Sequence, residues 1–314
     1  MCISAKPAEF TGTKGYIGEA LHKGKLVHVL GYQNEAKNLS SGGNALILPI
    51  PSKTPITKDN IIDLGDKGKN LLNNLTRDYF APKESSRGLL LNSSTKSVRF
   101  FKSGIYEIVV SEKPSLIFEA LKEVSDEKRP EISQELLKWY EDYYPGWSIA
   151  VCCFNSQEKV ESAPMFWMYE PLDENNLFFP GMDGHKGSVP DLSSLVRVDH
   201  KIVLGSHLFE DGKVAHTLRE GYYDKMVDED LLSLFSTKIL GRRFWGKLKN
   251  GDFKINVDSL RKQKREDLLR VQGDTQVEAT ESSTHMELMD QFTPAAEEDF
   301  SLSGFFSGKV HLPK

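Results

Sequence analysis

The stretch that decides the fold runs from residue 16 to residue 32 and reads YIGEALHKGKLVHVLGY. Residues 16–21 form an extended run, residues 22–25 are typical of a turn, and residues 26–32 alternate apolar and polar side chains. Alternation with a period of two indicates a strand with one buried face, and a glycine-containing turn joins two such runs. This stretch therefore predicts two neighbouring strands of a β-meander.

The predicted meander extends on both sides of this stretch. Residues 2–10 form another extended run, and residues 11–15 (TGTKG) are predicted to be a turn. A polar stretch over residues 34–43 leads to the nearly all-apolar run 44–51, NALILPIP. Its two prolines lack backbone donors, so strand pairing is expected to end at that edge.

The rest of the sequence mixes strand-length apolar runs with helical patterns, and residues 178–199 show little period and are predicted to be a loop. The predicted strands are 106–110, 147–154, 164–169 and 202–205, and the predicted helices are 61–79, 115–124, 133–143 and one that begins at Asp228. The prediction is a single α+β domain over residues 2–270. It contains a largely antiparallel sheet, opening with the meander, with helices packed beside it.

Composition restricts the class of protein. The 314 residues contain 40 Lys and Arg against 45 Asp and Glu, a formal net charge of -5, which does not indicate binding to nucleic acid or to an anionic membrane. No apolar run approaches the roughly 20 residues of a membrane-spanning helix, and the first residues lack the pattern of a signal peptide. Three cysteines form no visible disulfide framework. A cytoplasmic location is expected.

The C-terminal part of the sequence changes composition. No Lys or Arg occurs between Arg270 and Lys309, and residues 271–299 are rich in Thr, Ser, Gln and Glu, which predicts a disordered acidic linker. Residues 300–314 then restore hydrophobicity through four side chains, Phe300, Leu302, Phe305 and Phe306. Such a tethered cluster is predicted to dock on a protein partner, on a second copy of the chain or on its own domain. The alternative is a C-terminal strand that completes the fold.

Three features of the sequence resemble a family of uncharacterised, predicted secreted bacterial proteins, the domain of unknown function 2330. They are Cys2 at the start of the mature chain, the strand that ends in Leu48-Pro49-Ile50-Pro51, and a strand, helix and returning strand around Gly146-Trp147. The resemblance covers about two thirds of the chain, although the family's secretion signal and cysteine-rich N-terminus are missing. It implies a shared fold and, since the family has no settled activity, no function.

Cys2 is a candidate nucleophile. If Met1 is removed, the chain begins with a free amine beside a thiol, which is the arrangement of N-terminal-nucleophile hydrolases. Asn44 and Asn34 are candidate oxyanion donors. The candidate substrate-binding cations are Arg77, Arg87 and Arg99. The alternative is a second-position cysteine without a role.

Histidine and aspartate are concentrated in one region. The residues are Asp183, His185, Asp191, Asp199, His200 and His207. These residue types bind zinc or iron, but their spacing matches no ligand signature, and Gly181, Asp183 and Gly184 fit a tight turn. The prediction is a structural loop, with no metal and no cofactor.

Two further features have simple interpretations. Cys152 and Cys153 lie in an apolar strand and are predicted to be buried and inert. Residues 238–270 hold eleven basic and four acidic residues, interleaved with Phe244, Trp245 and Phe253. Such a pattern can hold single-stranded nucleic acid, but a solvated basic face is the commoner explanation, and the acidic tail could fold back over it.

Two function classes remain open. The first is a non-enzymatic interaction or scaffold protein that uses its tail and its basic face. The second is an N-terminal cysteine hydrolase that acts on an amide or peptide bond through Cys2. The first is favoured because the sequence shows no complete catalytic set.

Overall fold

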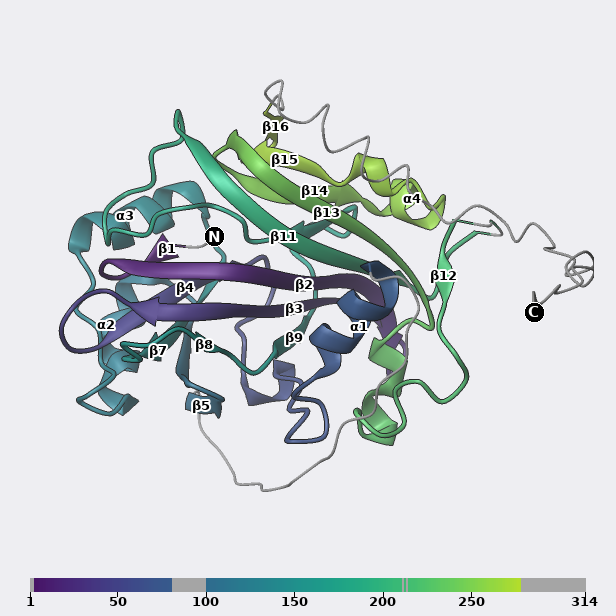
Figure 1. Cartoon of the computed structure of the whole chain (residues 1–314), viewed down its shortest axis with the longest axis horizontal. Coiled ribbons are helices and arrows are strands. Elements are labelled where there is room, and N and C mark those ends of the chain that lie inside the picture. Colours follow the sequence, from purple (N-terminus) through teal and green to yellow (C-terminus); the bar gives the residue numbers. More distant parts are fainter. Residues whose placement is uncertain (1–2, 81–99, 211, 213, 278–314) are drawn as a thin grey trace, which may run out of the picture.

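The computed structural model describes residues 3–80, 100–210, 212 and 214–277, and Figure 1 shows its arrangement. Antiparallel sheets with a few helices form an α+β fold, as predicted. None of the helices in these residue ranges is long and apolar enough to cross a membrane.

Strands make up most of the regular structure. They are β1 (Ile3–Ser4), β2 (Ala8–His22), β3 (Lys25–Asn38), β4 (Asn44–Ile50), β5 (Phe100–Ser103), β6 (Tyr106–Ser111), β7 (Ser148–Phe154), β8 (Val160–Glu161), β9 (Met165–Tyr169), β10 (Asn176–Phe179), β11 (Leu195–Ser206), β12 (His216–Thr217), β13 (Lys238–Lys249), β14 (Asp252–Asn256), β15 (Leu269–Gln272) and β16 (Thr275–Gln276).

Helical segments are short. They are α1 (Leu71–Phe80), α2 (Ile117–Ala120), α3 (Gln134–Tyr143), α4 (Val257–Arg261) and the 3-10 turns η1 (Lys58–Asn60), η2 (Pro114–Leu116), η3 (Leu121–Glu123), η4 (Glu229–Leu234) and η5 (Arg265–Asp267). The predicted helix over residues 133–143 is confirmed as α3, with the Ser133 side chain accepting the Leu136 N–H at its start.

The described strands form three sheets. The largest has the order β12-β13-β11-β2-β3-β8, with β9 also pairing with β3. The second has the order β1-β4-β7-β6-β5, and the third has the order β10-β14-β15-β16. The pair β2 and β11 is parallel, whereas the other strand pairs of these sheets are antiparallel.

The meander differs from the prediction in one respect. The turn at Lys23 and Gly24 is present, and both residues have positive φ, as a tight hairpin turn requires. However, residues 11–15 are not a turn, because β2 continues through them with a shift in register between Thr11 and Lys14. Gly12 adopts a left-handed conformation there, so the glycine makes a β-bulge and the strand does not reverse.

The two larger sheets and the helices that cover them stack in four layers, and the four-stranded sheet packs into the same core through Phe179 and Phe253. The inner faces of the seven-stranded and five-stranded sheets share one core cluster, which includes Leu30, Ile202 and Cys152. Helices α2 and α3 cover the outer face of the five-stranded sheet, where Cys153 is buried. Helix α1 and the η4 segment cover part of the outer face of the seven-stranded sheet (Figure 1). Both cysteines are fully buried, as predicted, one on each side of β7.

Three predicted boundaries are wrong. The predicted helix over residues 61–79 is helical only from Leu71, because Gly65 has a positive φ and the chain before α1 forms turns. The predicted loop over residues 178–199 contains parts of β10 and β11. The first residues of the predicted linker form β15 and β16 instead, so the folded domain continues to residue 277.

Candidate functional site

The outer face of the seven-stranded sheet has a covered half and an open half. In the covered half, Tyr16, Val203 and Ile239 pack in the cluster that contains α1. Gly241 lies directly beneath α1, since a Cβ atom built there would come within 2.5 Å of the Tyr79 ring. Because side chains alternate along a strand, the odd-numbered residues that continue along β11 and β13 point out of the same face. These residues form the open half.

The open half presents an exposed tryptophan among cations. Antiparallel pairing places Trp245 opposite Asp199, Arg243 opposite Lys201 and Lys247 opposite Arg197. The Trp245 side chain is 48% exposed. Hereafter, the Trp245 surface is the set Arg197, Lys201, Arg243, Trp245 and Lys247.

Two arginines flank the indole of Trp245. The guanidinium carbon of Arg243 lies 5.1 Å from the ring centroid, and that of Arg197 lies 5.9 Å from it. Both are within the range of a cation–π contact, which orders the two guanidinium groups beside the ring. The result is an aromatic plane with a positive charge on two sides.

Cations outnumber carboxylates on the Trp245 surface. Within the described ranges, Arg197, Lys201 and Arg243 form no ion pair with a carboxylate. Burial lowers the pKa of Lys201, and the nearby charges of Arg243 and Lys14 lower it further. Among the described residues of β11 and β13, Asp199 is the one carboxylate beside these cations on this face, and it also accepts the Gly12 N–H at 2.6 Å. The surface therefore favours anionic ligands.

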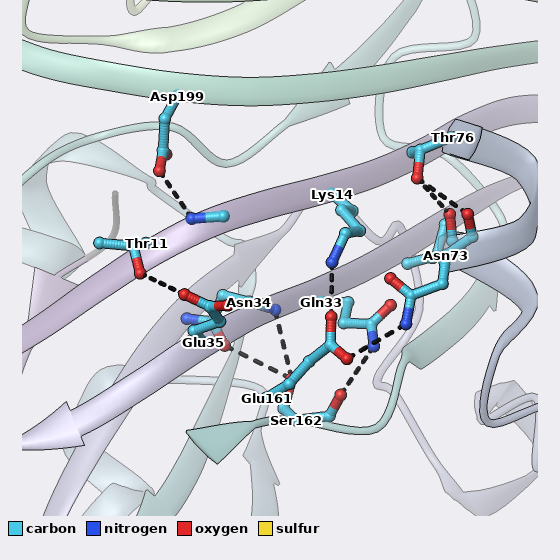
Figure 2. A network of polar contacts seen from close by, with 12 residues as sticks. Thr11, Lys14, Gln33, Asn34, Glu35, Asn73, Thr76, Glu161, Ser162 and Asp199 are labelled. Carbon is cyan, nitrogen blue, oxygen red and sulfur yellow. Dashed lines mark hydrogen bonds and ion pairs between the residues drawn. The ribbon is translucent and has the colours of Figure 1, made fainter. Parts of the chain in front are cut away.

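A polar network fixes the sheet beside the Trp245 surface, as Figure 2 shows. Lys14 donates to Glu161 at 2.5 Å, and Asn73 of α1 donates to the same carboxylate at 3.2 Å. Thr11 donates to Glu35 at 2.7 Å across β2 and β3. These contacts tie β2, β3, β8 and α1 together beside β11, which carries part of the Trp245 surface.

The predicted catalytic residues are only partly described. Cys2, Arg87 and Arg99 lie outside the described residues. The Asn44 Nδ2 atom donates to the Pro7 carbonyl at 3.1 Å and to Asn38 Oδ1 at 3.0 Å, and Oδ1 accepts the Lys6 N–H at 2.9 Å. Asn44 thereby orders the segment after β1. Its proposed role as an oxyanion donor stays a prediction.

The other polar candidates lie apart. Asn34 accepts the Tyr106 hydroxyl at 2.9 Å inside the core, and Arg77 on α1 pairs with its neighbour Asp78. They do not join Asn44 in one site. Among the described residues, no group of three or more His, Cys, Asp or Glu is arranged to hold a metal ion.

The His/Asp region packs against the first strand. Ile3 bridges Gly184, and the Ser4 N–H donates to the Gly184 carbonyl at 2.9 Å. Asp183 and His185 flank Gly184 in the sequence, and the His185 Nε2 atom lies 3.3 Å from Asp183 Oδ1. Burial lowers the pKa of His185 to about 3 and raises that of Asp183. The remaining members of the region are separate: Asp191 accepts from Ser193, His200 is buried beside Asp199, and His207 is exposed.

The structure describes the predicted basic segment but not the apolar residues of the tail. Of the segment's three predicted aromatics, Phe244 and Phe253 are buried in the core and Trp245 is exposed. The sequence predicted a basic face, but it missed Arg197 and Lys201, which reach that face from β11. The tail residues Phe300, Leu302, Phe305 and Phe306 lie outside the described residues.

The chain was compared with known proteins. No protein-family model and no curated protein matches it, and the likeness to the domain of unknown function 2330 remains a prediction. Among solved structures, it is similar to the crystal structure of baculovirus P35, with 13% identity over 82% of this chain and 92% of that chain and a TM-score of 0.39. It is also similar to P35 in a complex with caspase-8, with 12% identity over 78% of this chain and 87% of that chain and a TM-score of 0.32. At these identities and TM-scores, the likeness supports no functional conclusion.

Proposed function

We propose that this protein is a non-enzymatic interaction protein that binds an acidic polypeptide segment through the Trp245 surface, with residues 300–314 as a second docking element. The observation that carries the proposal is an exposed tryptophan between two arginines that pair with no carboxylate among the described residues.

The chemistry of this surface favours a protein ligand. Tryptophan and arginine are the residue types enriched where most of the binding energy of a protein interface is concentrated. Arginine also binds carboxylates through two parallel hydrogen bonds, and ordered guanidinium groups lose less entropy in doing so. An acidic segment with interspersed apolar residues would match both the cations and the indole.

Nucleic acid is a poorer match for the whole molecule. The net charge of -5 opposes a polyanion at long range, whereas a short acidic segment meets mainly the local charge of the surface. The basic residues also occupy one half of one sheet face, beside the carboxylates of Glu35 and Glu161.

A binding experiment tests the proposal. A fluorescent glutamate-rich peptide with interspersed leucine is titrated into the full chain, the Arg243→Glu and Trp245→Ala variants, and the control Arg219→Glu. Arg219 is an exposed arginine on a different part of the chain, so the control makes the same charge change. We expect each surface variant to raise the Kd about 10-fold or more, equal to about 1.4 kcal/mol, and the control to leave it unchanged. Equal Kd values, or tighter binding of a single-stranded oligonucleotide at the same sites, would contradict the proposal.

A second candidate function is an amide or peptide hydrolase that uses Cys2. The observation in its favour is that Ile3, which follows Cys2 in the sequence, bridges Gly184 between Asp183 and His185. Burial lowers the pKa of His185 to about 3, so the ring is neutral at pH 7 and would be a weak base toward the Cys2 thiol. Intact mass separates the two candidates first, because a retained Met1 blocks the free-amine mechanism. If Met1 is absent, hydrolysis of peptide amides that Cys2→Ala abolishes would support the hydrolase.

A further inference from the structure

We propose that the chain's own acidic segment, residues 278–299, occupies the Trp245 surface in the resting protein and competes with any acidic partner. This inference rests on the proposed function, because it names the first occupant of the same surface. Three observations support it: complementary charge, the position at which the described chain ends, and the spacing of apolar residues in the segment.

Charge complementarity is the first observation. Residues 278–299 contain no Lys or Arg. Their acidic residues are Glu278, Glu281, Glu287, Asp290, Glu297, Glu298 and Asp299. The Trp245 surface contains four cations, of which Arg197, Lys201 and Arg243 form no ion pair within the described ranges, and Lys249 continues the row at the end of β13. Attraction between two such sets is strongest when they belong to one chain, because a tether raises the local concentration to about the millimolar range.

The second observation is the place in the fold at which the described residues end. Strand β15 lies beside β14, and the Gln272 side chain donates to the Asn250 carbonyl at 2.8 Å, directly after β13 ends at Lys249. Figure 1 shows β15 and β16 next to the start of β11 and the end of β13. Trp245 is four residues before Lys249 on β13, a distance of about 13 Å at about 3.3 Å per residue.

The length of the segment is sufficient for this contact. The 22 residues from 278 to 299 have a flexible-chain dimension of roughly 25 Å, and a much larger reach when extended. The chain therefore reaches the whole Trp245 surface without strain. The cost of closing such a loop grows only slowly with length.

The sequence of the segment is the third observation. Residues 287–292 read ELMDQF, in which the acidic Glu287 and Asp290 are interspersed with Leu288, Met289 and Phe292. The carboxylates match the arginines, and the apolar side chains match the exposed indole, where methionine makes favourable contacts with aromatic rings. We therefore assign residues 287–292 as the part of the segment that contacts Trp245.

The test uses the full chain. One variant replaces the seven acidic residues of the segment by their amides, and a control variant does the same at the exposed Glu229 and Asp230. Acrylamide quenching of Trp245 is isolated by subtracting the spectrum of the matching Trp245→Phe protein. We expect the seven-fold amide variant to show increased quenching of Trp245 and about 10-fold tighter binding of the glutamate-rich peptide, while the control variant changes neither.

The outcomes separate this inference from the proposed function. If the wild type and the amide variant bind the peptide equally, and Arg243→Glu weakens both, the surface is correct and the inference is overturned. If neither protein binds the peptide, the proposed function itself fails. If protection of Trp245 disappears on dilution, the segment of a second copy is the occupant, which also overturns the inference.

Discussion

His200 is fully buried among aromatic rings, and its ring nitrogens make no hydrogen bond within the described residues. Burial disfavours the charged imidazolium and lowers the pKa of His200 well below its usual range, and the positive charge of Arg270 acts in the same direction. Above about pH 6.5, the ring is neutral in both the folded and the unfolded chain. As the pH falls below that value, the unfolded chain binds a proton that the folded chain excludes. The free energy of unfolding therefore decreases.

We predict that His200→Gln reduces this loss of stability with acidification by up to about 1.4 kcal/mol per pH unit. Urea unfolding at a series of pH values from neutral down to about 5 measures the slope. The exposed His207→Gln variant serves as the control. An unchanged slope in His200→Gln would show that the folded protein protonates this ring.

Thiol reactivity is the second property at this scale. Cys152 and Cys153 are fully buried, and burial raises the pKa of the Cys153 thiol, which lowers the fraction of reactive thiolate. We predict that iodoacetamide labels Cys2 in the native protein at least 10-fold faster than either strand cysteine. Peptide mass mapping after a time course gives the three rates. Labelling of all three cysteines at similar rates would contradict the buried position of β7.

At the scale of elements, one ion pair joins distant parts of the chain. Arg261 of α4 donates from Nε and Nη2 to the two carboxylate oxygens of Glu19 on β2, at 2.9 and 2.6 Å. The Ser206 hydroxyl of β11 donates to the same carboxylate at 2.7 Å. Because Glu19 is only 2% exposed, its charge depends on these partners.

We predict that Arg261→Met lowers the free energy of unfolding by about 3 kcal/mol, since it leaves a buried carboxylate without its cation. Chemical denaturation measures the change, with the exposed neighbour Lys262→Met as the matched control. A Glu19→Gln and Arg261→Met double variant is expected to recover part of the loss, because the buried charge is then absent. Equal stability of Arg261→Met and Lys262→Met would show that the pair contributes nothing.

The sequence predicts those strands, turns and helices whose signal lies within a short stretch of neighbouring residues. The hairpin turn at Lys23 and Gly24, the buried strand β7 and the helix α3 each carry their signal within about ten residues. The sequence around Gly12 predicts a turn as readily as a bulge, because glycine supplies a positive φ in both cases. Only the pairing of β2 with β3 distinguishes them.

The candidate surface was harder to predict because it depends on long-range pairing. The first half of β11 carries exposed Arg197 and half-buried Asp199 and Lys201 on one face and mostly buried residues on the other, whereas the weak period of residues 178–199 predicts a loop. Its true alternation is that of a strand with a solvated face. The approach of Arg197 to Trp245 follows from β11–β13 register, which a single sequence does not contain.

At the scale of the whole molecule, the four layers explain where a ligand can bind. Helices cover the outer face of the five-stranded sheet and part of the outer face of the seven-stranded sheet, and the inner faces of both are buried in one core together with the four-stranded sheet. The open half of the seven-stranded sheet therefore has a different chemistry, with charged and aromatic side chains in place of a core. Arg197, Arg243 and Trp245 are exposed in this half, where a ligand can reach them.

The last prediction concerns the apolar cluster Phe300, Leu302, Phe305 and Phe306, which follows the acidic segment. Each such side chain gains about 1.5–3 kcal/mol when fully buried, so the cluster favours a contact that removes it from water. We predict that Phe305→Ser with Phe306→Ser in the full chain abolishes self-association or partner binding and leaves the melting temperature within about 2 °C of the wild type. Light scattering over a concentration series and thermal unfolding measure the two properties, and Ser303→Ala is the control in the same segment. A fall of many degrees in melting temperature would instead assign the cluster to the folded core, as a C-terminal strand would require.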